Sequence, residues 1–114
     1  MTTEGIEAVF LETHNWGKAA KFWQALGFEL EFDTGHESGQ LRNGAGPYVF
    51  IAEVPENKPT GISIVLKATD ASGVDNPAVE VVKPFEKTHY GTNEMTVRDS
   101  DGREWILQAP SKDA

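Results

Sequence analysis

The first quarter of the chain combines one strand pattern with one helix pattern. Residues 7–13 are rich in β-branched and apolar side chains and predict a strand. Apolar residues then recur at spacings of three and four, which predicts a helix over 16–26 with a single buried stripe. Asn15 is suited to cap the N-terminus of this helix, and Gly27 is suited to end it. The stripe consists of Ala19, Phe22, Trp23 and Leu26.

Three further strands follow the helix. Residues 28–32 alternate strictly between apolar and acidic side chains and predict a strand with one apolar face. A glycine-rich hairpin over 34–39 leads into a short strand at 40–42, and a turn then leads into the strand 48–52. The order of elements is therefore β-α-β-β-β.

The second half of the chain repeats the first at an offset of 56 positions. Two copies of one supersecondary unit explain this better than chance. The chain is thus expected to be a single domain, 1–114, with one module at about 5–55 and a second at about 61–110. The identical pairs are Gly5/Gly61, Ile6/Ile62, Val9/Val65, Thr13/Thr69, Gly35/Gly91, Arg42/Arg98 and Gly46/Gly102.

The second copy departs from the first where its helix belongs. Residues 70–77 contain Gly and Pro in what would be the helix interior, so we expect a loop or a single turn there. A strand at 79–82 then begins early, and an arm over 84–90 precedes a hairpin of strands at 94–98 and 104–108. Strands with one helix predict the α+β class.

Two motifs resemble those of the vicinal-oxygen-chelate superfamily, which contains glyoxalases, bleomycin-resistance proteins and extradiol dioxygenases. Residues 19–28, AAKFWQALGF, resemble its "A..FY..LGF" opening. Residues 91–102, GTNEMTVRDSDG, resemble its "GTREFTVRDPDG" close. The resemblance implies two βαβββ modules that curve into a half-barrel cup with the ligand on its concave face, the second module having its helix reduced. It also implies a homodimer, since many members pair.

Metal-dependent members of this superfamily place one His or Glu on the first and last strand of each module. The resemblance carries these positions onto Ala8, Phe50, Ile64 and Ile106, none of which can coordinate an ion. If the register slipped by one residue, Glu53 would supply a single ligand, and one carboxylate does not hold a metal. We therefore expect no metal and no cofactor, as in the bleomycin-resistance-like branch.

Without a metal, the concave face implied by the resemblance is largely apolar. Such a face suits an apolar or aromatic small molecule held by a few polar groups. Phe22, Trp23 and Phe28 are better explained as core between helix and sheet. The alternative is that the concave side chains fill the cup as core. The expected ligand-binding residues are Ala8, Phe10, Phe50, Ile64, Leu66, Ile106, Gln108, His89 and Tyr90, and no catalytic residue is assigned.

The missing helix predicts an uncovered apolar patch in the second module. Val65, Trp105, Leu107 and part of 79–82 would lack the cover that the first helix provides. Because exposed apolar patches of this kind usually mark interfaces, we expect a second subunit to cover them in a two-fold symmetric dimer.

Composition excludes several other functions. The formal net charge is −8 and the pI about 4.7, with Lys and Arg scattered singly, which is unlike a nucleic-acid binder. The chain has no cysteine, no signal-peptide pattern and no apolar run of the ~20 residues that a membrane span needs. We expect a cytoplasmic protein with a small-molecule partner.

Three hypotheses for function remain after these exclusions. The preferred one is a metal-free protein that sequesters its ligand, as antibiotic-resistance members of the superfamily do. The second is a lyase, isomerase or dioxygenase of the same fold, using a divalent metal or a carboxylate or His acid–base group, with His89, Glu12 and Glu94 as candidates. The third is an interaction subunit whose cup is filled by side chains.

Overall fold

The computed structural model describes residues 1–110, which form one helix and eight strands. The mixture confirms the α+β class, and the first five elements have the predicted β-α-β-β-β order. In chain order the elements are β1 (Thr3–Thr13), α1 (Trp16–Ala25), β2 (Glu29–Asp33), β3 (Ser38–Arg42), β4 (Tyr48–Glu53), β5 (Ile62–Ala68), β6 (Glu80–Lys87), β7 (Thr92–Arg98) and β8 (Glu104–Pro110).

The chain divides into two compact units that follow the repeat. One unit is Ala8–Ser63, and the other combines Met1–Glu7 with the chain from Ile64 onward. The boundaries differ from the predicted modules chiefly because β1 is long and its first residues belong to the second unit. There, the backbone N–H of Thr69 donates to the carbonyl of Thr2 at 2.9 Å.

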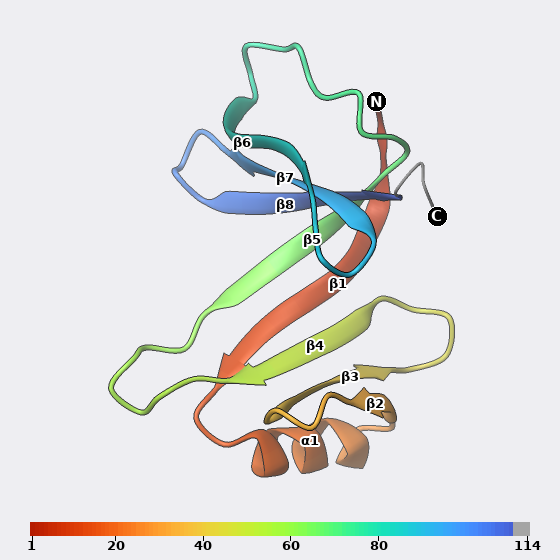
Figure 1. Ribbon diagram of the computed structural model, residues 1–114, viewed down its shortest axis with the longest axis vertical. Helices are drawn as coiled ribbons and strands as arrows, with labels where there is room; N and C mark the ends of the chain where they lie inside the picture. Colours follow the sequence, from red (N-terminus) through yellow and green to blue (C-terminus); the bar gives the residue numbers. More distant parts are fainter. Residues whose placement is uncertain (111–114) are drawn as a thin grey trace. The chain divides into compact units, whose positions relative to one another are not determined.

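In the Ala8–Ser63 unit, helix α1 packs on one face of strands in the order β2-β3-β4-β1 (Figure 1). Strand β3 is antiparallel to both β2 and β4, whereas β4 is parallel to β1. The parallel pairing follows from the crossover through α1. The core between helix and sheet consists of Leu41, Val49 and Ile51, with Leu11, Trp16, Ala19, Trp23 and Phe28 packed around them.

The two ends of α1 are formed as the sequence predicts. The side chain of Asn15 accepts a hydrogen bond from the N–H of Lys18 at 3.0 Å, which satisfies one of the free donors of the first turn. Gly27 has a φ of +98°, a left-handed conformation that glycine adopts without strain. The helix ends at Ala25, one residue earlier than predicted.

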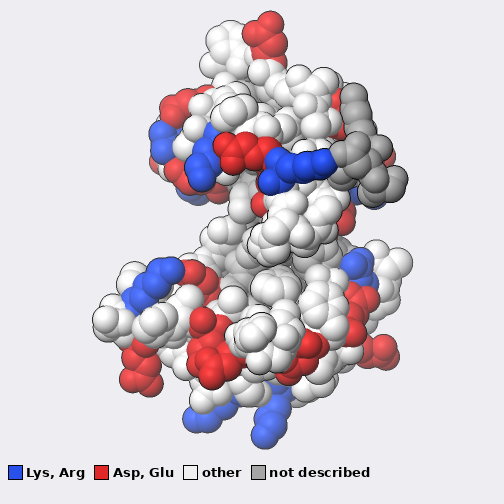
Figure 2. All heavy atoms as spheres, in the orientation of Figure 1, with Lys and Arg blue, Asp and Glu red and all other residues white. Residues whose placement is uncertain are grey.

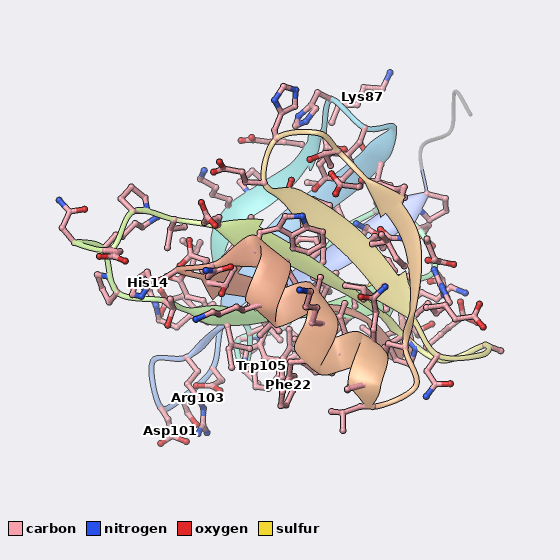
Figure 3. The ribbon with its side chains drawn as sticks, turned by 90° about the horizontal axis from the view of Figure 1, so that it is seen from below. His14, Phe22, Lys87, Asp101, Arg103 and Trp105 are labelled. Atoms are coloured by element: carbon pink, nitrogen blue, oxygen red, sulfur yellow. The ribbon has the colours of Figure 1, made fainter. Side chains whose placement is uncertain are left out.

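The prediction that Phe22 and Leu26 belong to the buried stripe is wrong. Their exposed fractions are 59% and 58%. The helix packs through Trp16, Ala19 and Trp23, whose spacings of three and four form their own stripe. Phe22 is at the flank of that stripe and projects into solvent (Figure 3).

Strand β2 does not keep the single apolar face that its alternation predicts. Phe28 packs in the core beside α1, and Leu30 lies opposite the buried Leu41. The register then shifts between Leu30 and Phe32, so Phe32 lies opposite Gln40 on the other face of the sheet. A bulge adds one residue to one strand only and re-aims the side chains that follow it.

The second unit has strands in the order β5-β8-β7-β6 and, as predicted, no helix over residues 70–77. The segment between β5 and β6 nevertheless covers the face where a helix would pack. Ala71, Val74 and Val79 contact the buried cluster from this segment. That cluster consists of Ala68, Met95, Val97, Leu107 and Ala109.

This cover removes most of the predicted apolar patch. Leu107 is only 4% exposed, Val65 has no exposed surface, and Trp105 is half-buried. What remains exposed is Val81 and Val82 on β6, at 41% and 37%. The expectation that Val65 and Leu107 need a partner subunit is therefore wrong.

Charged side chains of both signs are interspersed over the visible surface of each unit (Figure 2). Several are paired at the surface, as where Arg98 bonds to Glu80 and Glu104. Among residues 1–110, no helix is long and apolar enough to cross a membrane.

Candidate functional site

An aromatic cluster lies on the sheet of the Ala8–Ser63 unit, on the face opposite the helix. The ring centroid of Phe10 is 6.4 Å from that of Tyr48 and 6.0 Å from that of Phe50. Phe32 extends the cluster, with its ring 6.5 Å from Phe50. Phe32 is 47% exposed, and the other three rings are half-buried. We call Phe10, Phe32, Tyr48 and Phe50 the aromatic face.

The alternation of strands explains why these rings share a face. Leu11 and Ile51 point into the core beneath the helix, so their neighbours Phe10 and Phe50 point the other way. The parallel register of β1 and β4 places Phe10 directly beside Phe50. The bulge in β2 then brings Phe32 onto the same face.

A paired group of polar side chains borders the aromatic face. The Nε of Arg42 donates to both carboxylate oxygens of Glu31, at 3.1 and 3.2 Å, and its guanidinium lies 5.4 Å from the ring centroid of Tyr48. Gln40 donates to Glu31 at 3.0 Å. The hydrogen bonds from Gln40 and then Arg42 lower the pKa of Glu31, because they stabilise its charged form. These charges are therefore paired with one another.

The structure brings together three of the predicted ligand-binding residues in this unit, with different exposures. Ala8 lies opposite Tyr48 on β4, at the edge of the aromatic face. Because Ala8 has no exposed surface, it supports the rings rather than offering surface to a ligand. Phe10 and Phe50 form the centre of the aromatic face.

In the second unit, two more predicted residues bond to the carboxylate of Glu94, and a third lies beside one of them. Gln108 donates from Nε2 to Oε2 of Glu94 at 3.0 Å, and the hydroxyl of Tyr90 donates to the same oxygen. The ring of His89 lies 5.0 Å from that of Tyr90, edge to face. Ile106 lies two residues before Gln108 on β8 and so shares its face.

Leu66 does not share the face of Ile106, contrary to the prediction. It lies opposite Leu107 and packs into the buried cluster. Ile64, two residues earlier on β5, lies on the same side as Leu66. The cause is the pairing of β5 with β8, which is shifted by one residue relative to the pairing of β1 with β4. In the first unit Phe10 lies opposite Phe50, so the repeat predicts Leu66 opposite Ile106, but Val65 lies there instead. Such a slip exchanges the two faces of a strand.

The residues at the superfamily's metal positions do not fit a metal ion. Ala8, Phe50, Ile64 and Ile106 carry only hydrocarbon side chains, and Val65, which the slip places beside Ile106, is also apolar. A divalent ion needs three or four N, O or S donors. Within residues 1–110, no group of three or more His, Asp or Glu side chains is close enough to hold one.

Glu53, the single ligand that a slipped register would supply, has a structural role. Its Oε1 accepts the backbone N–H of Trp16 at 2.9 Å, at the start of α1. This bond, together with a hydrogen bond from Glu37, lowers the pKa of Glu53. The same hydrogen bond raises the pKa of Glu37, which donates it, and the neighbouring negative charge of Glu53 raises that pKa further.

Sequence reasoning missed Phe32 and Tyr48, and it assigned no binding role to Glu94. Tyr48 is two residues before Phe50 on one strand, a spacing that signals a shared face. Phe32 gave no such signal, because the bulge that re-aims it is not visible in the alternation. Glu94 pairs with Gln108 across β7 and β8, a contact that depends on the register of that hairpin.

No family model matches the chain. An uncharacterized protein of Mycolicibacterium smegmatis is 25% identical over 117 residues, which covers 98% of this chain and 99% of that protein.

Solved structures share the fold at low sequence identity. A glyoxalase/bleomycin resistance protein/dioxygenase superfamily member from Vibrio splendidus has a TM-score of 0.65 at 17% identity and covers 95% of this chain and 99% of its own. A Legionella pneumophila protein named as an NAD-dependent benzaldehyde dehydrogenase has a TM-score of 0.64 at 13% identity, covering 91% and 98%.

A third structure, methylmalonyl-CoA epimerase of Streptomyces coelicolor, has a TM-score of 0.57 at 15% identity and covers 96% of this chain and 99% of its own. Likeness at these identities is evidence of fold and carries no activity with it. Together with the β-α-β-β-β order of the first module, these matches show that the chain has the fold of the vicinal-oxygen-chelate superfamily.

Proposed function

We propose that the protein binds a largely apolar or aromatic small molecule on its aromatic face, without a metal. The observation that carries this proposal is the cluster of four rings on the sheet face opposite α1. Ligand sites are lined mainly by apolar and aromatic side chains with a few polar groups beside them. Here Arg42 and Glu31 are paired beside the rings, so the ring surface itself provides the contact.

The apolar residues at the expected metal-ligand positions support binding of the ligand without metal chemistry. A protein that only sequesters its ligand removes no more ligand from solution than its own molar amount, whereas an enzyme converts many equivalents of the ligand. The enzyme alternative is favoured by two neighbours of similar fold, one named as an epimerase and the other as a dehydrogenase. Counting the equivalents of ligand converted separates these two functions.

Binding is tested with a neutral aromatic probe, 1-naphthylmethanol, titrated into labelled protein and followed by amide chemical shifts. We expect saturable binding with the largest shifts on β1 and β4, and unchanged probe afterwards. Phe50→Ala removes the central ring and is expected to weaken binding about tenfold, equivalent to about 1.4 kcal/mol.

Phe22→Ala is the matched control, because it removes an equal ring from the exposed flank of α1. Its affinity should equal that of the wild type. Absence of saturable binding, or equal losses in the two variants, contradicts the proposal.

We also propose that the protein acts as a two-fold symmetric homodimer. The support is the pair of valines, Val81 and Val82, that stays exposed on β6. Exposed apolar surface of this kind is typical of interfaces. Sedimentation at micromolar concentration should give a dimer, and a single monomeric species contradicts this proposal.

A further inference from the structure

An amide side chain lies in the middle of the aromatic face. Gln40 on β3 is directly opposite Phe50 on β4 and directly opposite Phe32 on β2. Residues that are directly opposite each other in antiparallel strands point to the same face of the sheet. Leu41, the next residue on β3, is buried beneath the helix, as expected if Gln40 points the other way. Gln40 is therefore a polar group that two of the four rings flank.

The carboxylate of Glu31 fixes which way this amide faces. Nε2 of Gln40 donates to Oε1 of Glu31 at 3.0 Å, and Nε of Arg42 donates to the same carboxylate. These hydrogen bonds, that from Gln40 first, lower the pKa of Glu31, so at neutral pH its carboxylate is ionised and can only accept. The reversed amide would place its carbonyl oxygen against that negative charge. The NH2 group of Gln40 is thus held toward Glu31, and its carbonyl oxygen is directed away.

This carbonyl oxygen is available to a ligand. Among residues 1–110, the hydrogen bond found at the side chain of Gln40 is made by Nε2, and no donor reaches Oε1. No buried or half-buried residue in this range has a side-chain nitrogen or oxygen that is both inaccessible and without a partner. Gln40 is half-buried, so its Oε1 reaches the surface. An aromatic ligand that covered the flanking rings would exclude water from this oxygen, and an acceptor left unpaired in this way costs free energy.

The charges nearby favour a neutral donor over an ionic group. Arg42 and Glu31 pair with each other at 3.1 Å, so they offer no unpaired charge to an ionic ligand. A ligand carboxylate has no proton to donate to Oε1 and would be repelled by Glu31. A neutral hydroxyl or N–H group supplies the proton without the cost of burying a charge. The surroundings of Gln40 therefore fit a neutral hydrogen-bond donor.

We propose that the ligand donates a hydrogen bond to Oε1 of Gln40 from a neutral hydroxyl or N–H group beside its aromatic ring. This inference rests on the proposed function, because it names the class of ligand that the aromatic face takes. The rings provide the contact area, and Gln40 selects among aromatic molecules. A ligand without the donor covers the oxygen and leaves it unpaired, so it binds more weakly.

The test compares 1-naphthylmethanol with its methyl ether, 1-(methoxymethyl)naphthalene, which has the same ring system and no donor. Both probes are titrated into the wild type, Gln40→Met and Gln24→Met. Methionine is also long and unbranched but lacks the amide. The ratio of alcohol to ether affinity should fall about fivefold from the wild type to Gln40→Met, the factor that one neutral hydrogen bond contributes. Comparing ratios cancels the contribution of the added methyl group.

Gln24→Met is the matched control, because it makes the same change on the exposed surface of α1. It should keep the wild-type ratio, and an equal fall in both variants overturns the inference. An unchanged ratio in Gln40→Met also overturns the role of Gln40 but leaves the aromatic face as the binding site. If neither probe binds saturably, the proposed function fails as well.

The wild type alone gives the answer if Gln40→Met does not fold. The side-chain carbonyl carbon of Gln40 is followed by NMR while each probe is added to saturation. A hydrogen bond to Oε1 should shift this resonance more with the alcohol than with the ether. Equal shifts from the two probes overturn the inference.

Discussion

Gly39 occupies a position on β3 where the chain has no room for a side chain. A Cβ at this position would lie 2.6 Å from Cη2 of Trp16 and 2.7 Å from the carbonyl oxygen of Phe32. The indole of Trp16 rests on this glycine while its Nε1 donates to Asp33 at 3.3 Å. The contact joins the start of α1 to the β2–β3 hairpin.

Gly39→Ala is therefore expected to lower the free energy of unfolding by about 1–3 kcal/mol, the usual cost of overpacking. Urea denaturation followed by tryptophan fluorescence measures this change. The control is Gly17→Ala in α1, where the nearest atom to a Cβ is 3.6 Å away. That variant should gain about 0.5–1 kcal/mol, because alanine favours helix over glycine. Equal effects of the two substitutions would show that the Trp16 contact is wrong.

Asp99 holds the turn between β7 and β8 together through a single carboxylate. It accepts hydrogen bonds from Nε1 of Trp105 at 2.9 Å and from Nε of Arg103 at 3.1 Å. The backbone N–H groups of Asp101 and Arg103 donate to its other oxygen. These bonds, that from Trp105 first, lower the pKa of Asp99 far below its ordinary value. Asp101 and Arg103 themselves pair at the tip of the turn (Figure 3).

The lowered pKa of Asp99 gives a signed prediction for acid stability. Its contribution is fully present above the pKa of an unfolded aspartate and is lost as the pH falls through the lower folded value. Asp99→Asn should therefore reduce the urea midpoint at neutral pH, with the difference from the wild type narrowing in the acid range. A difference in urea midpoint between the two proteins that stays constant with pH would contradict the role of the Asp99 charge.

Single residues also mark the limit of what the sequence could predict about the site. Phe10 and Phe50 were assigned to one concave face from the superfamily resemblance, and they do share a face. Leu66 was predicted on the wrong face of β5, because its face depends on the register of β5 against β8. That register cannot be inferred from the local sequence pattern. Phe32 was missed because a bulge reverses its face.

At the scale of elements, α1 presents two rings with opposite surroundings. Trp23 packs in the core and lies edge to face with Phe28 at 5.0 Å between centroids, whereas Phe22 is 59% exposed. Trp23→Ala should cost about 3 kcal/mol of unfolding free energy, and Phe22→Ala under about 0.5 kcal/mol. Thermal or urea unfolding compares the two. Similar losses would mean that the buried stripe includes Phe22, as the sequence first indicated.

Elements with strong local signals were predictable, and elements fixed by tertiary contacts were not. Asn15 caps the start of the helix, and Gly27 ends it in a left-handed conformation; both signals are local. The loss of the second helix followed from Gly and Pro in its interior. The way in which Ala71 and Val74 replace that helix was not predictable, because it depends on how an irregular segment folds back onto Met95 and Leu107.

At the scale of the whole molecule, the repeat and its two motifs predicted the fold, and the structural neighbours confirm it. The function is less constrained, because one fold carries many activities. What narrows it is the chemistry of particular positions: hydrocarbon side chains at the positions where the superfamily resemblance places metal ligands, and aromatic rings on the sheet face opposite the helix.

The central claim is that this protein binds its ligand without a metal, and metal content tests it most directly. The purified, untagged protein is offered nickel, zinc, manganese and iron, desalted, and analysed for each element. We predict less than about a tenth of an equivalent of every metal, since Ala8, Phe50, Ile64 and Ile106 provide no donor atom. A full equivalent of any one metal would contradict the account, and Glu53, Glu12 and the histidines would then be the first ligands to test.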